Sequence, residues 1–161
     1  VALEVEGKST DGVVLDPVRG DVYWASVGRG AWCGSERLKV SEVENLSHAL
    51  VGTGFAYDRR ERAAFYLSYF KAVMERAQGV RRAGAASMDL VFLASGRLDA
   101  FWEFSLSRWD IAAGTLLVEE AGGVVTNHEG AALDLSAPSP LITNGKLHQE
   151  MIDLSTAVSG C

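Results

Sequence analysis

The sequence predicts an α/β fold in which an antiparallel meander over residues 1–40 precedes an α/β subdomain over residues 41–161. Two patterns predict it. In the first forty residues, apolar and polar side chains alternate between glycine-containing turns, which is typical of antiparallel strands. From Ser41 onward, short apolar runs alternate with segments of helical periodicity. This second pattern indicates βα units that build a mixed sheet with helices on both faces.

The meander is expected to contain four strands. They are expected at residues 1–6, 12–16, 21–28 and 37–40. Val1, Leu3 and Val5 already alternate with other residues at the start of the chain. We expect this first strand to lie at a sheet edge that lacks neighbours, which favours association. The meander also needs a covering layer that its own residues do not contain.

The second part is expected to contain five strands and four helices. The strands are expected at residues 50–55, 79–82, 98–104, 124–126 and 141–143. The helices are expected at residues 60–78, 85–95, 108–121 and 147–157. Apolar residues from Ala63 to Ala77 recur at helical spacing. Gly96 and Gly122 follow two of the helices and are typical stop signals.

Composition excludes several classes of protein. The 15 Lys and Arg residues and 21 Asp and Glu residues give a net charge of −6, so we expect neither a nucleic-acid partner nor an anionic membrane surface. No apolar stretch approaches the roughly 18 residues that a membrane span needs. Cys33 and Cys161 are too few for a disulfide framework, and the three histidines have no zinc spacing. These observations predict a cytoplasmic α/β protein.

The most specific pattern is residues 109–123, WDIAAGTLLVEEAGG. It resembles the C-terminal signature of the inositol monophosphatase family, which are magnesium-dependent, lithium-sensitive sugar phosphatases. Residues 28–34, 81–90 and 96–103 resemble three further segments of the same family. The resemblance implies a layered α-β-α-β-α sandwich and a homodimer. It also implies that a water molecule activated by two or three Mg²⁺ ions hydrolyses a phosphate monoester of a small sugar or polyol.

Inositol monophosphate is the substrate that the resemblance favours. Histidinol phosphate, a nucleotide 3′-phosphate and fructose 1,6-bisphosphate stay as alternatives within the same chemistry. A non-catalytic dimerising or regulatory module is the alternative from another class.

The family elements that supply most metal-binding carboxylates, G-E-E and D-P-(I/L)-D-G-T, are not found in this sequence. Asp16 begins a short Asp-Pro segment but lacks the rest of that motif, so we assign it to a turn. The resemblance therefore implies that residues 1–161 are the C-terminal portion of the family domain. We expect the isolated chain to be inactive without the missing N-terminal half. That half could be lost by cleavage or disorder, belong to a separate chain, or be absent from a shortened module.

Asp110 is the candidate metal ligand. A carboxylate in the first turn of a helix suits Mg²⁺, which prefers oxygen ligands, and the family binds metal with the matching Asp. The spacing from Ser107 to Asp110 alone favours another role, in which Asp110 caps the helix through a capping box.

The candidate substrate-binding residues are Glu103 and the turn formed by Gly84, Ala85 and Ala86. In the family, the Glu accepts a hydrogen bond from a substrate hydroxyl, and the turn holds the substrate ring. The local alternatives are a Glu on the solvent face of a strand and a helix start that only packs on the sheet. Ala85 replaces the common Ser or Thr of the family, which removes a hydroxyl donor. No catalytic residue is assigned to the chain itself.

Arg81 and Arg82 could meet phosphate, stabilise a dimer interface or be solvated. The family places this stretch near the subunit interface, so the resemblance favours the dimer contact. Residues 53–58, TGFAYD, resemble a stretch that is common in bacterial members and are expected to lie near the site without taking part in its chemistry.

Overall fold

The computed structural model describes residues 1–159, so Cys161 lies outside the described residues. The strands are β1 (Ala2–Val5), β2 (Lys8–Asp16), β3 (Asp21–Ser26), β4 (Gly30–Cys33), β5 (Glu36–Arg37), β6 (Leu50–Thr53), β7 (Gly79–Arg81), β8 (Ala100–Trp102), β9 (Val124–Asn127) and β10 (Pro140–Thr143). The helices are α1 (Ala63–Met74), α2 (Ala86–Ala94), α3 (Arg108–Glu120) and α4 (His148–Ser159), with a 3₁₀ turn at Leu46–His48.

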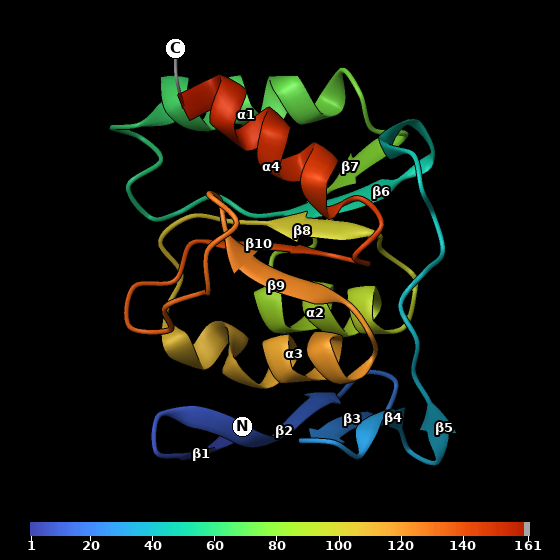
Figure 1. Cartoon of the computed structure of the whole chain (residues 1–161). Coiled ribbons are helices and arrows are strands. Elements are labelled where there is room, and N and C mark those ends of the chain that lie inside the picture. The colour runs from blue at the N-terminus through green and yellow to red at the C-terminus, as the bar shows by residue number, and fades with distance from the viewer. Residues whose placement is uncertain (160–161) are drawn as a thin grey trace.

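The elements form stacked layers (Figure 1). Helices α1 and α4 lie on one side of the second sheet, and α2 and α3 lie between that sheet and the first one. This order confirms the predicted layered α/β fold. The described residues supply the layers α-β-α-β, and no helix among them covers the outer face of the first sheet.

The first sheet is an antiparallel meander in the order β1-β2-β3-β4-β5. The prediction of a strand at residues 37–40 is wrong by position, because the strand is Glu36–Arg37, and the last bond to β4 runs from the Leu38 N–H to the Ala31 carbonyl at 2.8 Å. Beyond them the chain turns toward the helix layer, where the Val40 N–H donates to the carbonyl of Ala121 at 3.2 Å.

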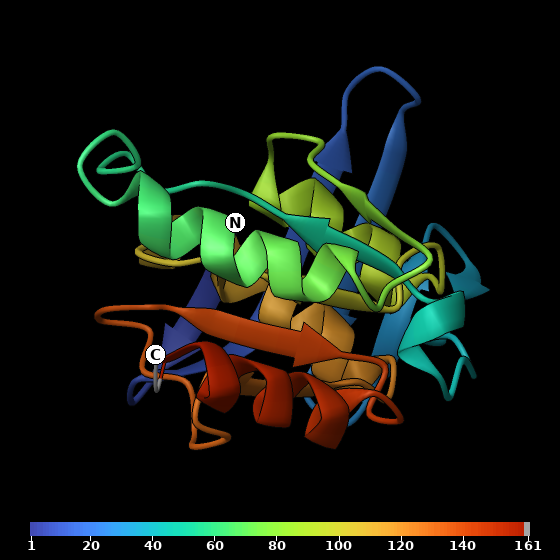
Figure 2. The same ribbon diagram turned by 90° about the horizontal axis from the view of Figure 1, so that it is seen from above.

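The second sheet has the order β7-β6-β8-β10-β9. Strands β7, β6 and β8 run parallel, and β10 pairs antiparallel with β8 and β9. The predicted mixed sheet with helices on both faces is confirmed. In the view from above, α1 and α4 cover the near face of this sheet, and α2 and α3 lie behind it (Figure 2). Helix α1 is shorter than predicted, since residues 60–62 and 75–78 form turns and bends at its ends.

Two glycines allow the middle layer to pack closely. A Cβ on Gly114 of α3 would lie 2.6 Å from Leu90 Cδ1 of α2, and a Cβ on Gly12 of β2 would lie 3.0 Å from the carbonyl oxygen of Ala113. Any larger residue at these positions would push α3 away from its neighbours. Helix α3 is therefore fixed against both α2 and the first sheet.

The outer face of the first sheet is apolar and exposed. Val13 and Leu15 of β2 are 42% and 56% exposed, whereas Val14 between them is buried against the helix layer. Leu3 of β1 and Val22 of β3 extend the same exposed face. A contiguous apolar surface of this kind marks an interaction site or favours aggregation. None of the helices in the described part is long and apolar enough to cross a membrane.

We predict that the 161-residue chain self-associates through this face. Replacing Val13 and Leu15 together by Lys should shift the chain toward monomer, because two charges would then interrupt the apolar surface. Sedimentation velocity measures the change. Val18→Lys is the control, because Val18 is 90% exposed in the β2–β3 turn, and it should leave association unchanged. A wild-type chain that sediments as one monomeric species would contradict the prediction.

Candidate functional site

A polar cavity of about 290 Å³ lies at the carboxyl ends of the parallel strands. Gly54 follows β6, Arg82 follows β7 and Glu103 follows β8, and all three line it. Ligands of α/β proteins commonly bind outside the carboxyl ends of such strands. The N-terminal ends of α2 and α3 complete the wall. All the predicted site residues lie here, namely Gly84, Ala85, Ala86, Glu103 and Asp110.

Glu103 lies in the segment that follows β8, so its prediction as a strand residue is wrong. Strand β8 ends at Trp102, where its partner β10 begins with Pro140, which has no N–H to continue the ladder. The Glu103 N–H instead donates to the Pro140 carbonyl at 3.3 Å. The side chain is half-buried and faces the cavity rather than open solvent.

Gly54 makes the room that the Glu103 carboxylate occupies. A Cβ on Gly54 would lie 2.1 Å from Glu103 Oε1 and 2.2 Å from Oε2. Burial, and then the nearby Asp89 and Asp110, raise the pKa of Glu103 to about 7, while Arg82 opposes the shift. The Glu103 carboxyl group is thus confined beside Gly54, and its protonated and ionised forms are close in free energy near neutral pH.

Asp110 is the third residue of α3, and its Oδ2 accepts a hydrogen bond from the Ser107 N–H at 3.0 Å. The capping role is therefore present in the structure. A metal role needs more donors than this one carboxylate. Within residues 1–159 no three His, Cys, Asp or Glu side chains converge on one point that could hold a metal ion. The residues present do not make a complete Mg²⁺ site, and the ligand role of Asp110 stays a prediction.

The start of α2 presents backbone donors to the cavity. Gly84 has φ +96°, a conformation that favours glycine, and it turns the chain into the helix. Ala85 is the N-cap and has no side-chain acceptor, so no side chain caps the first turn. A helix N-terminus of this kind attracts ligand oxygen atoms.

The predicted site residues did not include two residues that line the cavity. Arg82 lines it, with its Cζ 5.9 Å from the Phe55 ring, and its place at a dimer interface stays a prediction. Asp89 was overlooked, although it is the one acidic residue in an otherwise apolar helical segment. Outside the cavity, Asp16 is the last residue of β2, and its side chain accepts hydrogen bonds from the Val18 and Arg19 N–H groups of the turn that follows.

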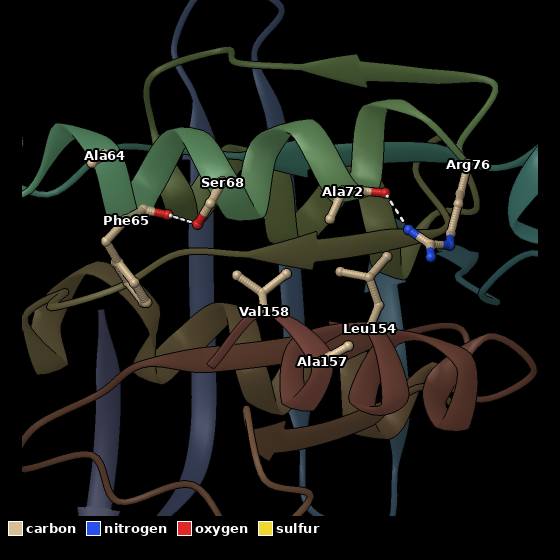
Figure 3. Close-up of a pocket in the computed structure, with 8 residues that line it drawn as sticks. All are labelled: Ala64, Phe65, Ser68, Ala72, Arg76, Leu154, Ala157 and Val158. Atoms are coloured by element: carbon tan, nitrogen blue, oxygen red, sulfur yellow. Dashed lines mark hydrogen bonds between the residues drawn. The ribbon is translucent and has the colours of Figure 1, made fainter. Parts of the chain in front are cut away.

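A larger cavity of about 560 Å³ lies between α1 and α4 (Figure 3). Its lining is mostly apolar, with Phe65 and Leu154 facing the space between the helices. Its polar groups are turned to the backbone, since Ser68 donates to the Phe65 carbonyl and Arg76 to that of Ala72. It offers no acid, base or metal ligand. The smaller polar cavity is therefore the candidate site.

A layered α/β fold with acids, an arginine and an uncapped helix start around one cavity defines a protein with a small-molecule site. The sequence profile of the Inositol monophosphatase family matches residues 1–159. The chain belongs to the inositol monophosphatase family.

Individual relatives agree with this assignment. The chain is 40% identical over 151 residues to an inositol-1-monophosphatase of Synechocystis, covering 94% of the chain and 53% of that protein. It is 48% identical over 133 residues to the Nus factor SuhB of Pseudomonas aeruginosa, covering 81% and 49%. The solved inositol monophosphatase from Anabaena superposes with a TM-score of 0.93 at 38% identity, covering 97% of the chain and 62% of that structure. The chain spans about half the length of these two curated relatives.

Gly54→Ala should lower the free energy of unfolding by about 1–3 kcal/mol, because its methyl group would collide with the Glu103 carboxylate. The collision disappears in a Glu103→Ala background, so the same glycine substitution should cost much less there. Urea unfolding of the four proteins in this double-mutant cycle measures the coupling. Equal costs in both backgrounds would show that the two residues do not meet.

Glu103 should also make stability depend on pH. Its raised pKa means that the folded chain holds a proton that the unfolded chain releases between about pH 4.5 and 7, so this group destabilises the fold as pH rises through that window. His128 has a lowered pKa of about 4 and acts in the opposite direction. The stability difference between Glu103→Gln and wild type isolates the Glu103 effect, and it should grow in favour of the variant from pH 5 to 7. A constant difference would contradict the prediction.

Proposed function

We propose that residues 1–161 form the C-terminal portion of a magnesium-dependent phosphatase that hydrolyses a phosphate monoester of a small polyol. The observation that carries the proposal is the single cavity that gathers Glu103, Asp110 and the uncapped start of α2. Family membership and the inositol-1-monophosphatase relatives support the class of reaction.

Each group has a role that its position supports. Glu103 accepts a hydrogen bond from a ring hydroxyl, since its carboxyl group is held inside the cavity by the space at Gly54. The N–H groups at the start of α2 hold substrate oxygen atoms. Arg82 places a positive charge on the same wall and favours an anionic ligand.

Asp110 supplies one metal ligand at the mouth of α3. Together with ligands from elsewhere, Asp110 would hold a Mg²⁺ ion, and that ion would supply charge neutralisation for the phosphate and a lower pKa for the attacking water. The other ligands must come from outside the described residues, because these contain no convergent set. The isolated chain is accordingly proposed to be inactive and to need the missing N-terminal half.

Inositol monophosphate is the favoured substrate, on the names of the relatives. Histidinol phosphate, a nucleotide 3′-phosphate and fructose 1,6-bisphosphate remain the other candidates, because Ala85 provides no hydroxyl that would select the ring. We also propose a cytoplasmic homodimer, with Arg81 and Arg82 near the subunit contact. A non-catalytic interaction role is the second candidate function, and the Nus factor name of the Pseudomonas relative is the observation that favours it.

A hybrid enzyme tests the proposal. The 161-residue chain alone should release no phosphate from inositol monophosphate above an Asp110→Asn control. Joined to the upstream portion of the Synechocystis relative, it should become active with Mg²⁺. In that hybrid, Asp110→Asn should reduce kcat/KM on the order of 100-fold, comparable to loss of a metal-site group.

Asp153→Asn is the matched control, since Asp153 is exposed on α4 away from the cavity, and it should leave the rate unchanged. A wild-type hybrid that folds, binds Mg²⁺ and releases no phosphate would overturn the enzymatic proposal and favour the interaction role.

A further inference from the structure

Asp89 is a buried acid in an apolar helix. Its neighbours Leu90, Val91 and Leu93 are 0% exposed, and Asp89 itself is 2% exposed. Its Oδ1 atom is buried and has no hydrogen-bond partner in the part of the chain that the structure describes. Native proteins rarely leave a buried side-chain oxygen unpaired, and each such atom calls for a cause.

Asp89 lies against β6. A Cβ built on Gly52 would be 3.7 Å from the Asp89 Cβ, which is an ordinary van der Waals contact. From there Asp89 lines the candidate site together with Glu103 and Arg82. It also lines a neighbouring cavity of about 410 Å³, so it forms part of the wall between the two.

Three acids, Asp89, Glu103 and Asp110, and two arginines, Arg59 and Arg82, line the candidate site. Glu103 and Asp89 are close enough for the charge of Asp89 to raise the pKa of Glu103, and burial raises the pKa of Asp89 itself to about 7. A phosphate dianion would be repelled by this acidic pair, so the pair is suited to the uncharged, hydroxyl-bearing part of a substrate. A carboxyl group in either protonation state can accept a hydrogen bond, and the protonated form can also donate one.

We propose that Asp89 is a specificity-determining residue that hydrogen-bonds one ring hydroxyl of the polyol phosphate while Glu103 holds another. The inference rests on the proposed function and narrows its substrate class to esters that carry at least two free hydroxyls. A site built to pair with a hydroxyl discriminates strongly against analogues that lack it, because its buried polar group is then left unpaired.

A purely structural role is the competing explanation. Asp89 lies in the first turn of α2, where a negative charge interacts favourably with the helix N-terminus. The two explanations differ in the effect of Asp89→Asn on stability. A structural Asp89 stabilises the fold, whereas a buried acid with an unpaired oxygen that is kept for ligand binding does not.

The first arm of the test is thermal unfolding of the 161-residue chain. Asp99→Asn is the matched control, because Asp99 is also buried but accepts a hydrogen bond from the Leu50 N–H at 2.6 Å and another from the Ser41 hydroxyl. Asp99→Asn should lower the unfolding midpoint clearly, and Asp89→Asn should leave it unchanged or raise it. An equal loss in both variants would overturn the proposal.

The second arm compares two substrates in the hybrid enzyme, inositol monophosphate and phenyl phosphate, whose ring carries no hydroxyl. Asp89→Leu, which can neither accept nor donate a hydrogen bond, should lower the ratio of their kcat/KM values about tenfold or more, and Asp99→Asn should keep the ratio within about twofold. An unchanged ratio for Asp89→Leu in an active hybrid would overturn this inference and leave the proposed phosphatase intact. Failure of the wild-type hybrid on both esters would overturn the proposed function itself.

Discussion

The close approach of α3 to its neighbours is the constraint on which the rest of the structure depends. Gly114 lets α3 touch Leu90 of α2, and Gly12 lets it touch the first sheet at Ala113. With these contacts, the N-terminal ends of both helices meet at one cavity, which also receives the carboxyl ends of the parallel strands. The apolar core and the polar site therefore share a structural cause.

The site is maintained at a cost to stability. Asp89 and Glu103 have pKa values raised mainly by burial, so their ionised forms oppose folding near neutral pH. The neighbouring Asp99 shows how an acid of similar burial can be satisfied by hydrogen bonds alone. The contrast is what the proposed binding role of the cavity acids predicts, because enzymes commonly trade stability for activity.

Local patterns predicted the layers but not the ends of the elements. Alternation and helical spacing act within one segment, so they identified the meander, the mixed sheet and the helices. The end of β8 depends on Pro140 of another strand, which is why Glu103 was placed on a strand. The contact of Gly54 with Glu103 and the place of Arg82 in the cavity likewise arise only when distant segments meet. Asp89 could have been predicted from the sequence as a site residue, because an acid in an apolar helix needs an explanation.

The two interpretations of Asp110 are compatible. A carboxylate has several lone-pair positions, and the Ser107 N–H uses only Oδ2. That bond orients the carboxylate at the mouth of α3, as outer groups orient metal ligands in general. Asn retains an oxygen that can accept the same bond, but it lacks the negative charge. Asp110→Asn therefore distinguishes the two roles. If Asp110 only caps α3, the variant should keep its stability and activity, and if Asp110 binds a divalent cation, the variant should lose that binding.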